Sequence, residues 1–285
     1  MLIHENAMLV TLKVKVWSGR KLDLQATEVV EKEYGSKKDG AGRFNKLLVA
    51  KESIKRMQSI ANEVRVTNNK FTLPWLDDGA RLLPAAHYWD WTVEMGAVVD
   101  KFNAAVKTIV NEYKDMKEEA KLRLKGLYCE ADYPEEEQLT MKFSVSYHRM
   151  PVPDSNDFRV KISDDEADII RDDINKQLNE ATSRARNEIW FKLRSMVSHI
   201  YEITKIPRKK FKNSSFDNLA EFCDLVPGLN ITEEAKLIEI NDKIITNLAG
   251  VDPDTMRHNL DERENVSIKA QMILEEIDVA RYGEN

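Results

Sequence analysis

The sequence predicts a mainly α-helical protein with a minor β component (an α+β fold), built around a long antiparallel coiled-coil arm. From Met95 to Ala120, apolar residues recur with alternating gaps of four and three residues, the spacing of a coiled-coil seam. A second apolar stripe runs from Ala167 to Ile203. Only 10 glycines and 8 prolines occur in 285 residues, which favours long elements and few tight turns.

Residues 1–82 predict a mixed α+β base. The stretch "LVTLKVKVW" (9–17) alternates apolar and polar residues, as a half-buried strand does. Helices are expected over about 24–33 and 43–65. The Gly-rich loop between them does not match a phosphate-binding loop, because Gly40 is followed by Ala41 and Gly42 instead of lysine.

Residues 83–206 predict the arm, with a β-insert at 127–162. Its first helix is expected to start near Pro84 and to end near Gly126. The second helix follows a capping box, Ser163 to Glu166, and stops before Pro207. Alternating residues at 139–147 and 158–162 predict a β-hairpin at the tip. We expect the two helices to pack against each other, and residues 207–285 to form a C-terminal helical region that completes the base.

No catalytic, cofactor or metal site is predicted. The 5 histidines are scattered, and none has a second ligand at a metal-site spacing. Cys129 and Cys223 lie far apart, so no disulfide framework is expected and a reducing compartment is the default. Neither a signal peptide nor a membrane-spanning stretch is evident, which predicts a cytoplasmic protein without membrane contact. Met8 is an alternative start, because the patterned sequence begins just after it.

Aromatic residues crowd the start of the first long helix. Tyr88, Trp89 and Trp91 occupy nearly adjacent positions and cannot all face one way on a helix. One interpretation is a thick core junction at the base of the arm. The other is a partner-binding surface formed by these residues and Tyr147, because aromatic side chains dominate protein-binding hot spots.

A basic segment follows the second long helix. It contains Lys205, Arg208, Lys209, Lys210, Phe211 and Lys212. Basic residues around an aromatic ring can hold single-stranded nucleic acid by charge and stacking. They can equally dock an acidic protein surface or form a solvated connector. The net charge of −6 argues against a dedicated duplex-DNA binder.

Three stretches carry a resemblance to a known family. "VKVWSGRKL" (14–22), "YGSKKDGAGRFNKL" (34–47) and "AGVDPDTMRHNLDERENV" (249–266) resemble phage and bacterial proteins of unassigned function. Genes of that family lie in phage genomes, sometimes beside genes for a MoxR-type ATPase and a von Willebrand A-type protein. The resemblance implies a phage-type accessory protein that acts through partners, and it transfers no active-site residue.

These observations lead us to expect a non-enzymatic protein that grips a host or phage protein complex. An inhibitor of a host anti-phage defence complex and an adaptor for the neighbouring ATPase both fit. Val98, Ala105 and Val110 widen the apolar face beside the seam, which predicts self-association into a dimer or tetramer. The alternative function is nucleic-acid binding through residues 205–212.

Overall fold

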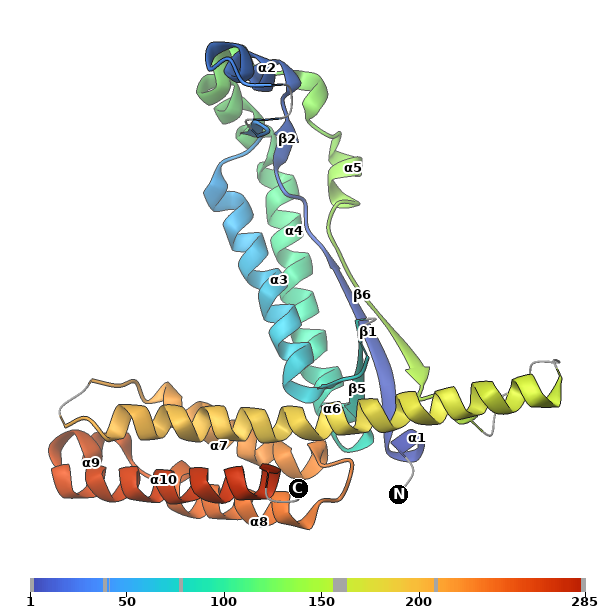
Figure 1. Cartoon of the computed structure of the whole chain (residues 1–285). Coiled ribbons are helices and arrows are strands. Elements are labelled where there is room, and N and C mark those ends of the chain that lie inside the picture. The colour runs from blue at the N-terminus through green and yellow to red at the C-terminus, as the bar shows by residue number, and fades with distance from the viewer. Residues whose placement is uncertain are drawn as a thin grey trace. The chain divides into compact units, whose positions relative to one another are not determined.

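The computed structural model describes residues 3–37, 40, 42–76, 79–155, 163–207 and 210–282. In this part of the chain the protein is mainly α-helical, with one four-stranded and one two-stranded sheet (Figure 1). The predicted fold class, mainly α with a minor β component, is therefore confirmed.

The chain forms two compact units made of interleaved segments. Unit 1 comprises Met1–Thr11, Phe71–Asp90 and His148–Asn285, and unit 2 comprises Leu12–Lys70 and Trp91–Tyr147. The regions expected from the sequence, 1–82, 83–206 and 207–285, do not coincide with these units. In each unit, segments that are distant in the chain pack together. Patterns along the sequence do not reveal such packing.

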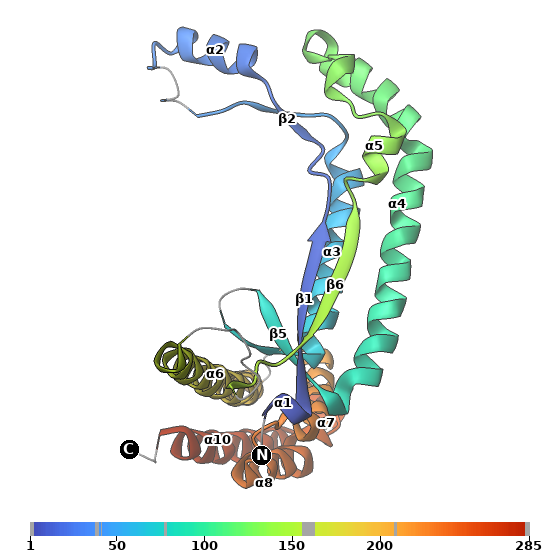
Figure 2. The ribbon, with the colours of Figure 1, turned by 90° about the vertical axis from the view of Figure 1, so that its right-hand side faces the viewer.

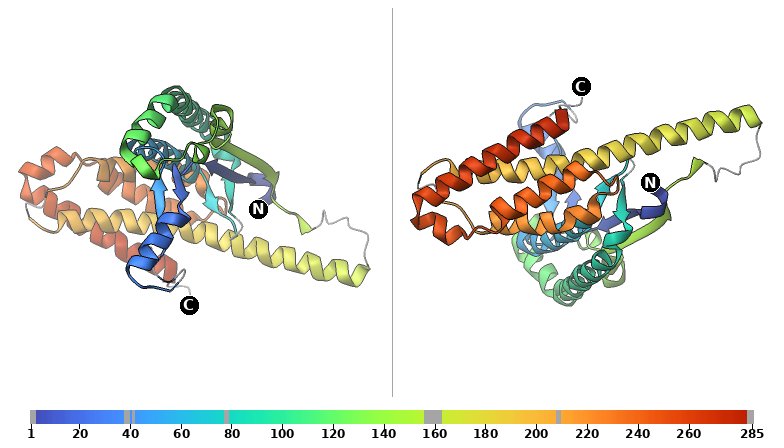
Figure 3. Two further views of the ribbon diagram at one scale, coloured as in Figure 1. Left: turned by 90° about the horizontal axis from the view of Figure 1, so that it is seen from above. Right: turned by 90° about the horizontal axis from the view of Figure 1, so that it is seen from below.

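Unit 1 is built mainly from helices. They are α6 (Asp164–Thr204), α7 (Ser214–Leu229), α8 (Ala235–Ile244), a π-helical turn (Ile245–Ala249), α9 (Pro253–His258) and α10 (Leu260–Tyr282). α6 packs against α7 and α10 (Figure 3). The predicted capping box starts α6, because the Ser163 hydroxyl accepts from the Glu166 amide (3.4 Å) and donates to the Glu166 carboxylate (2.7 Å). At the other end, buried Arg263 donates to the carbonyl oxygens of Ile203 and Thr204.

Unit 1 also contains the paired part of the four-stranded sheet. Its strands are β1 (Ala7–Lys15), β4 (Leu73–Pro74), β5 (Ala80–Pro84) and β6 (Ser144–Pro151), in the order β4-β5-β1-β6. β1 and β5 are antiparallel, with a register from Ala7 opposite Pro84 to Thr11 opposite Ala80. Alternating residues of these strands, such as Leu9 and Leu82, join the helical core. A short helix, α1 (Ile3–Asn6), precedes β1, and the 3₁₀ turn η1 (Ala85–His87) follows β5.

Unit 2 is organised by α3 (Lys51–Phe71) and α4 (Tyr88–Leu124), which lie side by side (Figure 2). Contacts run in opposite order along them: Asn68 accepts from Trp91 (3.1 Å), and Glu63 pairs with Lys101 (2.6 Å). The two helices are therefore antiparallel. The seam of α4 faces the interior, and its buried residues are Trp91, Met95, Val98, Phe102, Val106, Ile109, Tyr113, Met116 and Ala120.

The far end of α4 is held by a buried lysine. This part of unit 2 contains β2 (Arg20–Leu22), α2 (Leu24–Glu33), β3 (Asn45–Leu47), two 3₁₀ turns (Lys125–Leu127 and Glu130–Asp132) and α5 (Glu136–Thr140). Lys46, 7% exposed, pairs with Asp23 (2.9 Å) and Asp132 (2.7 Å). It also donates to the Leu127 carbonyl (3.0 Å), so one ammonium group links three segments.

The expected pairing of the two long helices into one arm is wrong. α4 is joined to α3 by the ion pairs Lys70–Glu94 and Glu63–Lys101, and the main neighbours of α6 are α7 and α10. An apolar stripe predicts that a helix face is covered, but it does not identify the covering element. The hairpin expected at the tip also differs, because the described part of 127–162 holds one strand, β6, which joins β1 in the larger sheet. Residues 158–162, the expected second strand, lie outside the described residues.

Candidate protein-binding surface

The first turn of α4 presents two aromatic rings in unit 1. Tyr88 is half-buried, whereas Trp89 is 74% exposed. Their rings meet edge to face, with centroids 5.2 Å apart. Such T-shaped contacts stabilise aromatic pairs beyond the area they bury. The indole of Trp89 is therefore held by its neighbour and still available to solvent.

Arg149, from the end of β6, completes this surface. Its guanidinium lies 5.6 Å from the centre of the Tyr88 ring and donates to the Tyr88 hydroxyl (3.2 Å). Tyr88, Trp89 and Arg149 thus form one aromatic–arginine cluster. Trp, Tyr and Arg are the residue types enriched among binding hot spots. The aromatic residues offer large contact areas with few rotatable bonds, and arginine offers planar hydrogen bonding.

The turn that carries this cluster is fixed by buried His87. Its Nε2 donates to the Leu225 carbonyl on α7 (2.9 Å), and its ring packs on Phe71 with centroids 5.9 Å apart. Gly228 on α7 leaves room for the imidazole, since a Cβ there would lie 2.4 Å from His87 Nε2. The start of α4 is therefore anchored to α7 within unit 1, which gives Trp89 a rigid support.

The other two predicted contact residues lie in unit 2. Trp91 is completely buried, and its Nε1 donates to Asn68 Oδ1 (3.1 Å). Tyr147 is half-buried and meets the Trp91 ring edge to face, with centroids 5.0 Å apart. Trp91 lies one turn before Met95, so it continues the buried seam, whereas Trp89 lies on another side of the helix. Trp91 is therefore a core residue, as the first interpretation expects, and partner binding by the exposed Trp89 stays a prediction.

The basic segment offers no open stacking platform at Phe211. This half-buried ring packs on Phe216, with centroids 5.8 Å apart, and the guanidinium carbons of Arg257 and Arg263 lie 5.2 and 5.3 Å from its centre. Nothing in the basic segment predicts these two arginines, because both lie far along the chain. Their contacts occupy the ring that a nucleobase would need.

The charges of the segment are less constrained. Lys205 forms an ion pair with Glu202 and lies 4.9 Å from the centre of the Tyr201 ring. Lys210 and Lys212 are exposed. Arg208 and Lys209 lie outside the described residues. These lysines could contribute charge. Within residues 205–207 and 210–212, however, the half-buried Phe211 is the one aromatic residue, so no exposed ring lies beside them in this segment.

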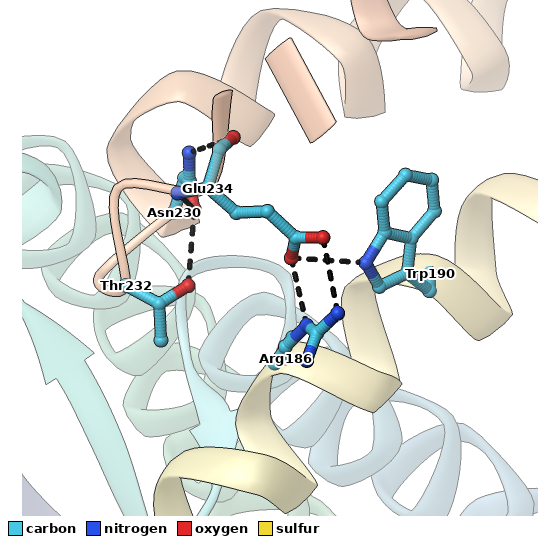
Figure 4. A network of polar contacts seen from close by, with 5 residues as sticks. All are labelled: Arg186, Trp190, Asn230, Thr232 and Glu234. Carbon is cyan, nitrogen blue, oxygen red and sulfur yellow. Dashed lines mark hydrogen bonds and ion pairs between the residues drawn. The ribbon is translucent and has the colours of Figure 1, made fainter. Parts of the chain in front are cut away.

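A polar network holds the loop between α7 and α8 to α6 (Figure 4). Glu234 accepts two bonds from the Arg186 guanidinium (2.8 and 3.2 Å) and one from Trp190 Nε1 (3.2 Å). Asn230 folds the loop by accepting from the Glu234 amide (3.0 Å) and from the Thr232 hydroxyl (3.3 Å). Each polar group finds its partner inside the network, which indicates a structural role.

A polar pocket of about 410 Å³ adjoins this loop. Asn179 and Thr182 of α6, Thr232 of the loop, and the pair His4 and Asp154 are among its lining residues. His4 Nε2 lies 3.8 Å from Asp154 Oδ2, so the two ionisable groups among the described lining residues face each other. The pocket presents amides and hydroxyls, without an arginine or lysine among these residues that could bind an anion.

One serine and one histidine are within hydrogen-bonding distance elsewhere in unit 1. Nε2 of the exposed His199 and Oγ of the half-buried Ser215 lie 3.1 Å apart. Among the described residues, no carboxylate contacts the other ring nitrogen of His199 to orient it, as a catalytic triad requires. This pair joins the end of α6 to the first turn of α7.

No described group of three or more His, Cys, Asp or Glu residues is arranged to hold a metal ion. None of the described helices combines the length and apolar character needed to cross a membrane.

Comparisons with known proteins do not assign the chain to a family. No family model matches it, and neither a curated protein nor a solved structure is found to be significantly similar to it.

Proposed function

We propose that this protein is a non-enzymatic, phage-type accessory protein that binds another protein complex through the aromatic–arginine cluster. The exposed Trp89, supported by Tyr88 and Arg149, is the observation that carries the proposal. Large exposed rings cost solvation free energy in an isolated protein, and they commonly serve as anchors that enter a pocket of a partner.

The bound complex belongs to the host or to the phage. Inhibition of a host anti-phage defence complex and adaptation of a partner to an ATPase are the two roles that fit such a protein. Both roles would use the aromatic–arginine cluster. They differ in whether the bound partner is a defence complex or an ATPase.

The experiment compares the full-length chain with Trp89→Ala, Tyr88→Ala and Arg149→Lys variants as affinity baits in lysate of phage-infected cells. Phe191→Ala is the matched control, because Phe191 is an aromatic residue of unit 1 that is 59% exposed on α6. Quantitative mass spectrometry should find one protein complex that the wild type and the control retain equally. Loss of a hot-spot tryptophan should lower its recovery by about 30-fold, the equivalent of 2 kcal/mol.

Arg149→Lys keeps the charge but loses the planar group over the Tyr88 ring, so it should lower recovery by less than the tryptophan variant. Equal retention by all variants, or no retained complex, would remove the basis for this function.

Nucleic-acid binding through residues 205–212 is the second candidate, with weaker support. The occupied ring of Phe211 argues against stacking, and charge alone would give salt-dependent, sequence-independent binding. Lys210→Ala with Lys212→Ala should then abolish retention of single strands at low salt, and unchanged retention would exclude this segment.

A further inference from the structure

The pocket beside the α7–α8 loop has the size of a small-molecule site. Its volume of about 410 Å³ lies within the range of about 300–1,000 Å³ that such sites enclose. All of its described lining residues belong to unit 1. Three of them are apolar, namely Ile3, Leu178 and Ile231, and the others are polar or ionisable. The pocket can therefore contact both apolar and hydrogen-bonding parts of one ligand.

Asn175 and Asn179 present two carboxamide groups on the same side of α6. Both line the pocket, and they lie one turn apart, where helix residues are neighbours. Both residues are exposed, and neither side chain forms a hydrogen bond with another described residue. A carboxamide offers a carbonyl acceptor beside an amino donor. Because a hydroxyl group both donates and accepts, two hydroxyls on neighbouring carbon atoms can bond to both parts of such a group.

The two threonines of the pocket favour a ligand that donates hydrogen bonds. The Thr182 hydroxyl donates to the Leu178 carbonyl (2.7 Å), and the Thr232 hydroxyl donates to Asn230 Oδ1 (3.3 Å; Figure 4). A hydroxyl has a single proton, so each threonine oxygen can offer a ligand only its lone pairs. The ionised carboxylate of Asp154 is also an acceptor without a donor.

The charges of the pocket disfavour both an anion and an ammonium group. The described lining contains no lysine or arginine. His4 is the one described lining group that can carry positive charge, and Asp154 at 3.8 Å balances it. An ammonium group could donate to Asp154, but it has no acceptor for the amino groups of Asn175 and Asn179. Hydroxyl groups supply donors and acceptors without charge.

We propose that this pocket binds an uncharged sugar ring that carries hydroxyl groups on neighbouring carbon atoms. The hydroxyls bond to the two carboxamides and to the threonine oxygens, and the C–H groups of the ring contact the apolar residues. This site is separate from the aromatic–arginine cluster, since neither Tyr88, Trp89 nor Arg149 is among its described lining residues.

The experiment follows the side-chain amino signals of the full-length chain, labelled with ¹⁵N-asparagine, by NMR. The probes are D-glucose, N-acetyl-D-glucosamine, D-ribose and adenosine, each titrated to about 10 mM, ten times a Kd of about 1 mM. At least one probe should shift the signals of Asn175 and Asn179 to saturation. The signal of Asn68, which is bonded to the buried Trp91 of unit 2, should stay in place.

The probes also distinguish the source of the sugar. Binding of a free monosaccharide assigns the site to carbohydrate, whereas binding of adenosine alone assigns it to the ribose of a nucleoside. In the second case 2′-deoxyadenosine, which lacks the neighbouring hydroxyls, should bind at least about tenfold more weakly. Glucose 6-phosphate should bind no more tightly than glucose, because the described lining holds no lysine or arginine for its phosphate.

Two variants test the assigned contacts. Asn179→Leu removes a carboxamide and Thr182→Val removes a hydroxyl, and each should weaken binding of the sugar by about tenfold. Asn187→Leu is the matched control, because Asn187 is exposed on α6 and is not among the lining residues. It should bind like the wild type, and circular dichroism should show that all three variants are folded.

The proposal fails if none of the four probes shifts the two asparagine signals. It also fails if Asn179→Leu and Thr182→Val bind as tightly as the control, if 2′-deoxyadenosine equals adenosine, or if glucose 6-phosphate binds more tightly than glucose.

Discussion

The two longest helices of the molecule have similar apolar stripes but very different surroundings. The seam of α4 is buried from Trp91 to Ala120, nearly the whole length of the helix. In α6, only Ala167 is buried before Ala181, although apolar residues such as Ile169, Ile170, Ile174 and Leu178 continue there. Figure 3 shows this N-terminal half of α6 extending past α7 and α10.

The difference separates two sources of helix stability. Packing against α3 and, farther along, against Trp17 and Pro134 stabilises α4, as expected for a helix with a covered stripe. The first half of α6 depends more on local interactions: the capping box at Ser163 and ion pairs such as Asp168 with Arg171 (2.6 Å). A stripe alone therefore does not show how a helix is stabilised.

The largest effect should come from the covered half of α6. Trp190, 1% exposed, packs in the core of unit 1 and donates to Glu234. Trp190→Ala should lower the free energy of unfolding by about 3–5 kcal/mol, because it leaves a cavity and removes buried apolar area. The control is Ile169, which is 63% exposed in the N-terminal half of α6. Ile169→Ala should change the free energy of unfolding by less than about 0.5 kcal/mol. Guanidinium unfolding measures both variants. Similar losses in the free energy of unfolding would show that the first half of α6 is covered in solution.

A smaller, local effect is expected at the start of α6. Ser163→Ala removes the side chain that accepts from the Glu166 amide, which should cost about 1 kcal/mol of helix stability. Because residues 164–180 have little packing, fraying should speed amide hydrogen exchange there while the melting temperature stays nearly unchanged. Ser183→Ala, at an exposed position inside the helix, should not speed exchange. Uniform acceleration across the whole of unit 1 would mean that the cap supports the global fold.

The smallest effect should appear at the cluster that holds the far end of α4. The amide of Ala26 and the ammonium of Lys46 lower the pKa of the Asp23 carboxyl. A carboxyl with a folded pKa below its unfolded value of about 3.9 stabilises the protein above that pH, and the contribution is lost as pH falls through the folded pKa. Asp23→Asn should thus be less stable than the wild type at pH 7, and urea unfolding should show this difference shrinking below pH 4. A difference that is independent of pH would assign the effect to capping geometry instead of charge.

Much of the local structure follows from the sequence, and the tertiary pairing does not. The start of α6 at Ser163 and its end before Pro207 are confirmed, because caps and prolines act within a few residues. The seam is expected to include Val99, but Val98 is buried and Val99 only half-buried, whereas the buried residues from Phe102 to Ala120 keep the expected spacing. Which helix covers which stripe depends on all elements together, and no short pattern encodes it.

The candidate surface shows the same limit. Tyr88 and Trp89 are recognisable as a concentration of aromatic residues, and the seam periodicity extended by one turn would have placed Trp91 in the core. Arg149 lies two positions after Tyr147 on a strand, so both side chains point to the same side. That signal could have suggested Arg149, but only once β6 was known to pass the start of α4.

The interleaved units also have a consequence for synthesis on the ribosome. All residues of unit 2 have been translated once Tyr147 is added, whereas unit 1 needs α10, the last helix. The apolar residue Leu9 of β1 shares its core with Ile273 and Ile277 of α10. Leu9 therefore cannot be fully buried until those residues have been translated. A nascent chain can therefore finish unit 2 first, while exposed strand residues of unit 1 are substrates for chaperones until α10 has been made.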